Sequence, residues 1–456
     1  MFRILMRIAI YVVTFVLIAG SVGAVGFRNS QIDFYQSFRE EPVPLLQGVT
    51  IPQHDPAKPT VAVVLGDTIT EDFDFLMPYN LFSRTGAYNV YAVAPDHQVK
   101  SLTGGLDVVP HVTFQELDGL LGKSPDIIVV PNMPNMLIFG SQYQSVLTWI
   151  KKHADTTLLS ICAGSAQLAD AGLLKGKSAA THWQIMPDMK RFFPDTAWTV
   201  SKRYVVEGNI ITSAGQTAGI DAVLYVISKE LGEPVANQIA KEVHYPSYPF
   251  LHHPNVDPYS IDLKFMTYLL NNAYQWHKQK TGVLLYNGIE ELALSSIFDS
   301  YSDTGTTNVL TISQSERPVV TAHNLILLAR YQMPNAPKLD KMIVPGADAK
   351  TIAAKDILQW QEAGRSENAL LIHEDSPDRF VFEAPIEDLS KQEDILSAEH
   401  AVKRLEYRAN QIMLEGKPFS LETYGNLILL TIISLLVARF IDKRFMTKKI
   451  KHLPYR

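Results

Sequence analysis

The residues most capable of chemistry lie in one stretch, residues 158–183. An apolar run ends at Cys162, small residues follow at 163–165, and helical spacing then continues. A strand, a tight turn and a helix would place the Cys162 sulfur near the first backbone N–H groups of the helix, where the dipole favours a thiolate. A lone cysteine is more often an inert buried residue. The elbow context favours a reactive nucleophile instead.

The elements that must position this cysteine alternate between strands and helices. Apolar or β-branched runs of buried-strand type occur at 60–65, 88–94, 127–130 and 157–161. Helical spacing occurs at 72–83, 141–152 and 216–231. This alternation predicts a parallel sheet covered on both faces, with reactive groups at the carboxyl ends of its strands.

Three ordered motifs resemble the ThiJ/PfpI family of the class I glutamine amidotransferase-like superfamily. They are Ser-Ile-Cys-Ala-Gly at 160–164, Ala-Thr-His-Trp at 180–183, and Ile-Ile-Thr-Ser-Ala-Gly-Gln-Thr-Ala-Gly-Ile-Asp at 210–221. Within the family, the chain most resembles the amidotransferase-like domain of AraC-type regulators and the isonitrile hydratases. The resemblance covers residues 59–245 and implies an α/β fold of flavodoxin-like type, a three-layer arrangement around a parallel sheet.

The resemblance also implies a set of site residues around Cys162. An acidic residue, three mostly apolar residues and Pro form a family pattern that Asp74 to Pro78 matches, so Asp74 is expected beside Cys162 and sharing one proton with it. His182 matches a histidine that acts as an acid/base auxiliary or lines the pocket. The further oxyanion or pocket residues are Ala163, whose backbone N–H is a candidate oxyanion donor, Gly164, Trp183, Thr217 and Asn132. The neighbouring Glu71 and Asp72 are interpreted as charges favoured at a helix N-terminus.

Two departures from the family pattern bear on activity. Relatives commonly carry Pro-Gly-Gly after the third strand, whereas this chain has Pro131, Asn132, Met133 and Pro134. Pro134 has no N–H, so the same oxyanion hole cannot be assumed. The helix-turn-helix domain of AraC-type relatives is missing, and the net charge of -6 comes without a large basic block in the interior. No nucleic-acid partner is therefore expected.

A second region repeats the pattern of the first. Residues 283–313 parallel residues 64–94 without a gap, and Lys341-Met-Ile-Val-Pro-Gly parallels Ile127-Ile-Val-Val-Pro-Asn. Residues 281–415 are therefore expected to form a degenerate second copy of the fold. It has no cysteine, and Ala293 stands where the first copy has Asp74, so it is interpreted as catalytically silent. Its expected role is to pack on the first copy or to present a pocket or partner surface.

Two connecting segments are expected beside these copies. Residues 246–280 are interpreted as an interdomain arm, and metal binding by His244, His252 and His253 is disfavoured because no carboxylate spacing supports it. Residues 393–414 carry closely spaced charges and are interpreted as a solvated connector.

Both ends of the chain contain membrane-type segments. Residues 8–26 are apolar and uncharged and follow Arg3 and Arg7, which suits a transmembrane anchor over 1–27 or a signal peptide. A polar, proline-bearing linker over 28–58 follows. Residues 422–442 are interpreted as a second transmembrane helix, with a buried core helix as the alternative. The basic residues that follow, in a tail over 443–456, are Lys443, Arg444, Lys448, Lys449, Lys451 and Arg456. Basic residues at both ends predict a two-pass membrane protein with both termini cytoplasmic and the soluble body outside.

Three functions remain open from the sequence. The first is a membrane-tethered cysteine hydrolase or hydratase acting on a small nitrogen- or carbonyl-containing substrate, without metal or cofactor. The second is a module that binds a small molecule or senses oxidants through Cys162. The third is a structural envelope protein with a vestigial site. A homo-oligomer or a membrane-protein partner is compatible with each of the three.

Overall fold

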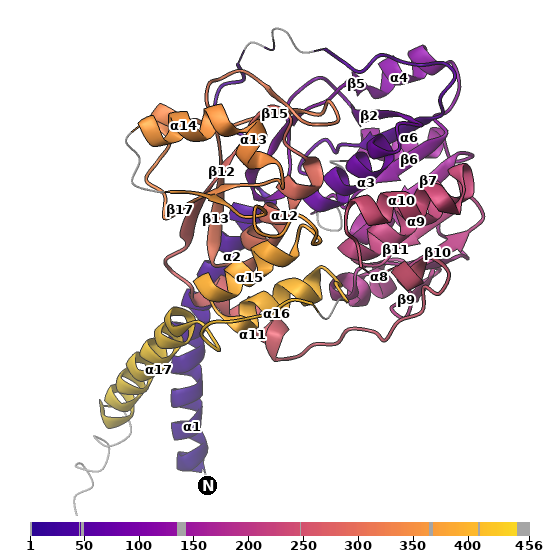
Figure 1. The fold of residues 1–456 in the computed structure, drawn as a ribbon. Helices are drawn as coiled ribbons and strands as arrows, with labels where there is room; N and C mark the ends of the chain where they lie inside the picture. The colour runs from indigo at the N-terminus through magenta and orange to yellow at the C-terminus, as the bar shows by residue number, and fades with distance from the viewer. Residues whose placement is uncertain are drawn as a thin grey trace, which may run out of the picture.

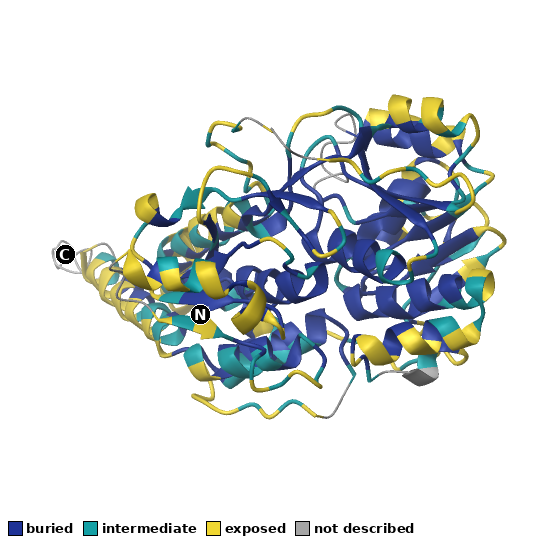
Figure 2. Ribbon diagram, turned by 45° about the horizontal axis from the view of Figure 1, so that its top comes forward, coloured by how far each residue is buried: buried dark blue, intermediate teal, exposed yellow. Residues whose placement is uncertain are grey.

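The computed structural model describes residues 2–44, 46, 50–134, 143–246, 248–363, 368–408 and 411–444. Two α/β units lie side by side, and a pair of helices projects from them (Figure 1). Exposed residues lie mainly on the outer helices and on the projecting pair, whereas the sheets and the helices between the units are buried (Figure 2).

The first unit is built on a sheet with the strand order β10-β11-β7-β6-β1-β2-β5. Only the pair β10–β11 is antiparallel. Val61 and Val63 point into one hydrophobic core with helix α3, while Ala62 and Val64 point into the other with helix α6. A buried parallel sheet needs this apolar character on both faces. The strands are β1 (Thr60–Val64), β2 (Asn89–Ala94), β5 (Val112–Thr113), β6 (Ile127–Val130), β7 (Thr157–Ser160), β10 (Tyr204–Glu207) and β11 (Ile210–Ser213).

Helices cover both faces of this sheet, so the three-layer α/β fold predicted from the sequence is confirmed. Its helices are α3 (Asp72–Arg84), α4 (Phe114–Leu121), α6 (Gln144–Lys152), α7 (Ser165–Asp170), α8 (Met186–Phe192), α9 (Gln216–Leu231) and α10 (Glu233–Glu242). A small parallel pair, β8 (Ser178–Ala180) and β9 (Ala197–Thr199), lies beside the main sheet.

The second unit contains a parallel sheet of order β16-β13-β12-β17-β18. The run β13-β12-β17-β18 has the same connectivity as β2-β1-β6-β7 of the first unit, and His373 follows β18 by the same spacing with which Cys162 follows β7. Descent of both units from one duplicated domain stays a prediction. The strands are β12 (Gln279–Leu284), β13 (Thr307–Ser313), β16 (Tyr331–Gln332), β17 (Lys341–Val344) and β18 (Ala369–Leu371), and the helices are α12 (Glu291–Tyr301), α13 (Ala349–Ile352), α14 (Ala354–Glu362), α15 (Glu383–Gln392) and α16 (Ile395–Arg404).

The two units meet through reciprocal contacts. A mixed sheet of order β14-β15-β4-β3 takes two strands from each unit and joins them by the antiparallel pair β15–β4. Helices α3 and α12 pack together across the same interface. Asn80 of α3 donates to Glu291, and Asp299, at the corresponding position of α12, lies near Glu71. Such reciprocity resembles a two-fold interface between identical subunits. The strands are β3 (Lys100–Ser101), β4 (Asp107–Val109), β14 (Val319–Val320) and β15 (Ile326–Leu328).

The N-terminal helix is longer than the sequence pattern predicts. Helix α1 (Phe2–Phe15), a π-helical turn (Val16–Gly20) and α2 (Ser21–Tyr35) run continuously, so residues 28–35 of the predicted linker are helical. Tertiary packing explains the difference, because α2 lies against α11 (Leu263–Tyr274). At Gly26 an added Cβ would lie 2.2 Å from the Ala273 carbonyl oxygen, so only glycine permits this approach. Helix α11 falls within the predicted interdomain arm.

The prediction of a solvated connector at 393–414 is wrong for the central part of this segment. Helix α16 is buried along Ser397, Ala398, His400, Ala401, Lys403 and Arg404. Arg404 is buried there because it pairs with the buried acidic residues Asp299 and Asp303, which the local sequence does not reveal.

Two helices are long and apolar enough to cross a membrane by length and composition, Phe2–Tyr35 and α17 (Leu421–Asp442). They project side by side from the same end of the body (Figure 1), and Arg7 forms an ion pair with Asp442 at 3.1 Å. The basic residues Lys448, Lys449, Lys451 and Arg456 lie outside the described residues, as does the first part of the predicted helix 141–152.

Candidate functional site

Cys162 lies on a sharp turn between β7 and α7, as the sequence predicts. Its φ of 54° places a non-glycine residue in the left-handed region, a conformation that persists only when surrounding contacts hold it. The Cys162 N–H donates to Ser213 Oγ at 3.3 Å, and Ser165 Oγ donates to the Cys162 carbonyl at 3.2 Å. Gly164 permits the close passage of β6, because a Cβ there would lie 2.1 Å from the Val130 carbonyl oxygen. The turn therefore depends on packing against two neighbouring strands.

The protonation of Cys162 differs from the expectation based on the helix N-terminus. Burial raises the pKa of the thiol well above its ordinary value, and the nearby Asp74 and Glu71 carboxyl groups raise it further. The Ala163 N–H lowers the thiol pKa through a hydrogen bond, but this effect is the smaller one. The site at rest therefore holds a thiol rather than the thiolate that the elbow alone would favour.

Asp74 lies in the first turn of α3, close enough to Cys162 to act on its charge. Its Oδ2 accepts from the Asn132 N–H at 3.2 Å, and its buried Oδ1 has no hydrogen-bond partner among the described residues. Among these residues no hydrogen bond links Asp74 to the Cys162 sulfur. Burial, followed by the charge of Asp299, raises the pKa of Asp74 to about 8. At neutral pH this carboxyl is mostly protonated and can donate a proton.

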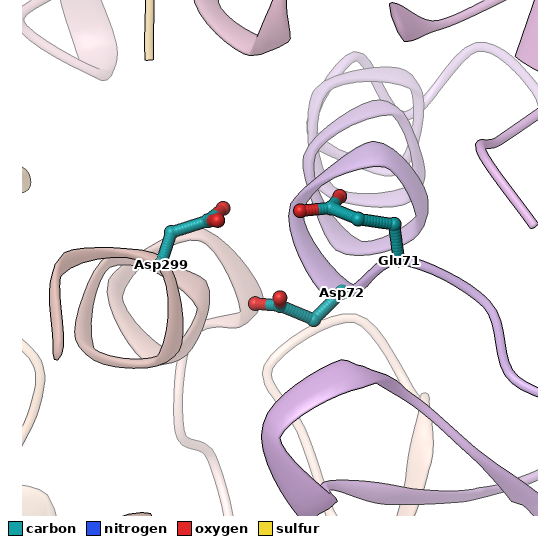
Figure 3. Close-up of side chains that lie close together, drawn as sticks. All are labelled: Glu71, Asp72 and Asp299. Atoms are coloured by element: carbon teal, nitrogen blue, oxygen red, sulfur yellow. The ribbon is translucent and has the colours of Figure 1, made fainter. Parts of the chain in front are cut away.

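Carboxyl groups from both units converge next to Asp74. The carboxyl groups of Glu71 and Asp72, at the start of α3, face that of Asp299 from α12 (Figure 3), and their oxygens lie within 4.8 Å of one another. Burial and mutual repulsion raise the pKa values of Glu71 and Asp72 well above their ordinary range. Glu71 also caps α3 by accepting from the Asp74 N–H at 2.7 Å, which agrees with its predicted place at the helix N-terminus.

Arg404 of α16 supplies positive charge to this acidic cluster. Its guanidinium pairs with Asp299, lies 2.9 Å from Asp303, and is 3.9 Å from Glu71. Gln216 donates from Nε2 to both Glu71 and Asp299 at 2.9 Å. Three such carboxylate oxygens have the spacing of metal ligands. Because the Arg404 guanidinium already lies among these carboxyl groups, the cluster is an ion-pair network.

His182 and Trp183 contact the end of α16. His182 Nε2 donates to the Arg404 carbonyl oxygen at 3.1 Å, and burial lowers the pKa of the imidazole to about 4. A neutral His182 cannot act as a general acid near pH 7. Trp183 is buried with the Lys403 ammonium 4.7 Å from its ring centroid, so both residues contact the end of α16.

Thr217 and Asn132 have partners within the protein. The Thr217 N–H and hydroxyl both donate to the Leu405 carbonyl oxygen, at 3.0 and 2.8 Å. Asn132 uses its N–H for Asp74, and its carbonyl oxygen accepts from the Glu71 N–H at 2.9 Å. This loop therefore positions Asp74 instead of presenting a free N–H group. The remainder of the loop lies outside the described residues.

Sequence reasoning missed the residues that reach the site from afar, namely Arg203, Asp299, Arg404 and Glu406. Arg203 is fully buried and pairs with Asp221. None of the four belongs to a local motif. For Arg404 and Glu406, the available signal was the closely charged and amphipathic segment 393–408, and the same pattern is common on exposed helices.

In a comparison with known protein families, residues 59–229 match the DJ-1/PfpI family. Isonitrile hydratase of Pseudomonas putida is 34% identical over 181 residues, covering 36% of this chain and 74% of the hydratase. The HTH-type transcriptional regulator CdhR of Pseudomonas aeruginosa is 34% identical over 100 residues, which cover 22% of this chain and 30% of the regulator. The crystal structure of a ThiJ/PfpI family protein from Pseudomonas syringae is 24% identical, covers 45% of this chain and 85% of that protein, and has a TM-score of 0.38.

Proposed function

Because the chain belongs to the DJ-1/PfpI family, we propose that its first unit is a cysteine-dependent hydratase or hydrolase acting on a small nitrogen- or carbonyl-containing substrate. The observation that carries this proposal is the strained Cys162 next to a carboxyl, Asp74, that is protonated at neutral pH. A nucleophile and a proton donor are the two groups that such an addition requires.

Hydration of an isonitrile illustrates the chemistry. The Cys162 sulfur forms a bond to the terminal carbon, that carbon takes the proton of Asp74, and the proton released by the thiol passes to the Asp74 carboxylate. Water then adds to the resulting thioimidate carbon, and the carbon–sulfur bond breaks. The product is an N-substituted formamide, and the thiol regains its proton. One water is consumed, and nothing is oxidised or reduced.

A second candidate function is binding without turnover. The raised pKa of Cys162 and the contacts of Thr217 and His182 with residues 404–406 favour a resting, occupied site. The similarity of this chain to a transcriptional regulator, CdhR, is compatible with a ligand-binding role for this type of domain. In this alternative a small molecule would bind beside Cys162 without conversion.

Turnover of an alkyl isonitrile by the detergent-solubilised full chain separates these functions. We expect the wild-type chain or its Glu406→Ala variant to produce the formamide. Replacing Cys162 by serine should lower the rate of formamide production by about 10³-fold or more. Asp170→Asn, at an exposed position after the elbow, is the matched control and should be unchanged. Saturable binding of the isonitrile with no formamide from either chain would support the binding module and exclude the hydratase.

We further propose that the chain is a two-pass membrane protein with both termini cytoplasmic. Apolar side chains on α1 and α17 are exposed, including Ile4, Leu5, Ile428 and Leu436, and a surface of this kind is typical of lipid contact. Arg3, Arg7, Lys443 and Arg444 lie at the outer ends of the two helices, on the side that the positive-inside rule assigns to the cytoplasm. The soluble body would then meet its substrate outside the cytoplasm.

Reporter fusions at the C-terminus test this topology. A green fluorescent protein fused there should fluoresce, and alkaline phosphatase fused at the same point should be inactive, because the phosphatase matures only outside the cytoplasm. Active phosphatase with a dark fluorescent reporter would place the C-terminus outside and contradict the proposal. Extraction of the chain by carbonate at high pH would contradict membrane insertion itself.

A further inference from the structure

Residues 404–406, at the end of α16, reach from the second unit into the Cys162 site. We call them the inserted segment. Their three carbonyl oxygens accept hydrogen bonds from the first unit: His182 donates to Arg404, Thr217 to Leu405, and Arg203 to Glu406 at 2.8 Å. A solvent-facing helix end would leave these carbonyls to water. Here each carbonyl oxygen has a donor in the first unit.

Backbone strain indicates that these contacts position Glu406. Its φ is 51°, one of four positive φ values at non-glycine residues in the described part of the chain, and Cys162 is another. Left-handed backbone is strained at a glutamate, because it carries a Cβ. The Glu406 carbonyl oxygen accepts from the Arg203 guanidinium at 2.8 Å, which supplies a compensating interaction. The interface therefore holds Glu406 in one conformation.

The side chain of Glu406 is directed at the N-terminus of α9. A Cβ added to Gly215, the residue that precedes α9, would lie 2.5 Å from Glu406 Cδ and 2.8 Å from its Oε1. The Gly215 N–H forms a hydrogen bond to the carboxyl group, and the charge of this group also acts on Cys162. Glu406 is 4% exposed, so its carboxyl is enclosed beside the cysteine.

Two opposing sets of effects act on the charge of the Glu406 carboxyl. Burial, the largest effect, and the charge of Asp221 raise its pKa above the ordinary value, whereas the charge of Arg203, the Gly215 N–H and the charge of Arg408 lower it. Arg203 is itself fully buried. A helix N-terminus and a buried guanidinium together are a recurrent setting for carboxylate recognition.

We propose that the site recognises substrates or ligands that bear a carboxylate, an inference that rests on the proposed function of Cys162. In the structure, the carboxyl group of Glu406 occupies the position where the carboxylate of such a molecule would bind. The inserted segment thereby keeps the site closed until it is displaced. The second unit, which has no cysteine of its own, then regulates the first by supplying this segment.

Alkylation of Cys162 by two reagents of similar size tests the proposal. Iodoacetate carries a carboxylate and iodoacetamide a neutral amide. Each forms a carbon–sulfur bond and releases iodide. The measured quantity is the ratio of the iodoacetate rate to the iodoacetamide rate in the detergent-solubilised full chain, divided by the same ratio for free cysteine. We expect Glu406→Ala to raise this ratio about tenfold or more over the wild type, the size of one charge-assisted hydrogen bond.

A double variant and a control locate the effect. Adding Gly215→Ala to Glu406→Ala places a methyl group where the Glu406 carboxyl lay, so the ratio should return toward the wild-type value. The backbone of Gly215, with φ of −92° and ψ of −171°, accepts alanine without strain. Glu415→Ala removes an exposed glutamate that pairs with Lys391, and should leave the ratio unchanged.

Other outcomes would overturn the proposal. If Glu406→Ala speeds both reagents equally, the segment blocks access but the site does not recognise a carboxylate. If neither rate changes in Glu406→Ala or in Glu406→Gln, which preserves the volume of the side chain, the segment does not occupy the site. These readouts need no turnover. A raised ratio without formamide formation would therefore uphold this inference while the hydratase proposal fails.

Discussion

Replacing Asp74 by asparagine is expected to lower turnover by about 10²–10⁴-fold while making Cys162 more reactive toward iodoacetamide above pH 8. The two effects have opposite signs for one reason. Asp74 is the proton donor in the proposed reaction, and it loses its proton near pH 8, before the thiol does. The wild-type thiol therefore titrates next to a carboxylate. Asparagine removes that charge, so the pKa of Cys162 should fall.

The pH dependence of Cys162 alkylation in the full chain measures this shift, and formamide production under the same conditions measures turnover. Asp170→Asn, which changes an exposed carboxylate, should move neither quantity. An unchanged or higher thiol pKa in Asp74→Asn would show that Asp74 does not act on Cys162. Unchanged turnover would remove Asp74 from the mechanism.

Replacing Arg404 by methionine is expected to destabilise the folded chain by on the order of 3–5 kcal/mol near pH 8. Arg404 compensates buried carboxyl groups from both units, and methionine keeps the bulk of the side chain while removing its charge. Urea denaturation followed by tryptophan fluorescence measures the free energy of unfolding. Lys391→Met, at a 60% exposed side chain paired with Glu415, is the control and should cost less than about 1 kcal/mol.

The same cluster predicts how stability depends on pH. The folded-state pKa values of Glu71, Asp72, Asp74, Asp299 and Asp303 are raised, so the folded chain binds more protons than the unfolded chain above about pH 4. Stability should therefore fall as the pH rises from about 4, through the pKa of Asp303 at about 6, to that of Asp74 at about 8. The fall should be steeper in Arg404→Met. Equal stability of variant and wild type at pH 8 would contradict the role assigned to Arg404.

The first unit is the part of the protein that could be predicted best. Its strands are short apolar runs, and small residues after β7 announce a tight turn, so local sequence carries both the sheet and the position of Cys162. Asp74 was identified through a family pattern, and it does lie near the cysteine. Its hydrogen bond to Asn132 and its distance from the sulfur depend on a loop conformation that no local pattern encodes.

The charged stretch at 393–414 shows where prediction from sequence fails. Closely spaced charges most often mark a solvated surface, because burying a charge without a partner is costly. Here the partners exist, but Asp299 and Asp303 come from α12 and the following turn, and Glu71 comes from the other unit. Pairing over such a separation can be recognised only after the chain has folded.

The amino-acid sequence by itself determined the α/β fold of the first unit and the tight turn at Cys162, because both follow from local hydrophobic spacing and small turn residues. Tertiary structure alone decided the ionisation of that cysteine and the occupant of its site. Burial and the charges of Asp74 and Glu71 set the pKa of Cys162, and Glu406 follows the end of a helix of the second unit. Electrostatic effects in a desolvated site depend on every charge within a few ångströms, and those neighbours are far apart in the chain.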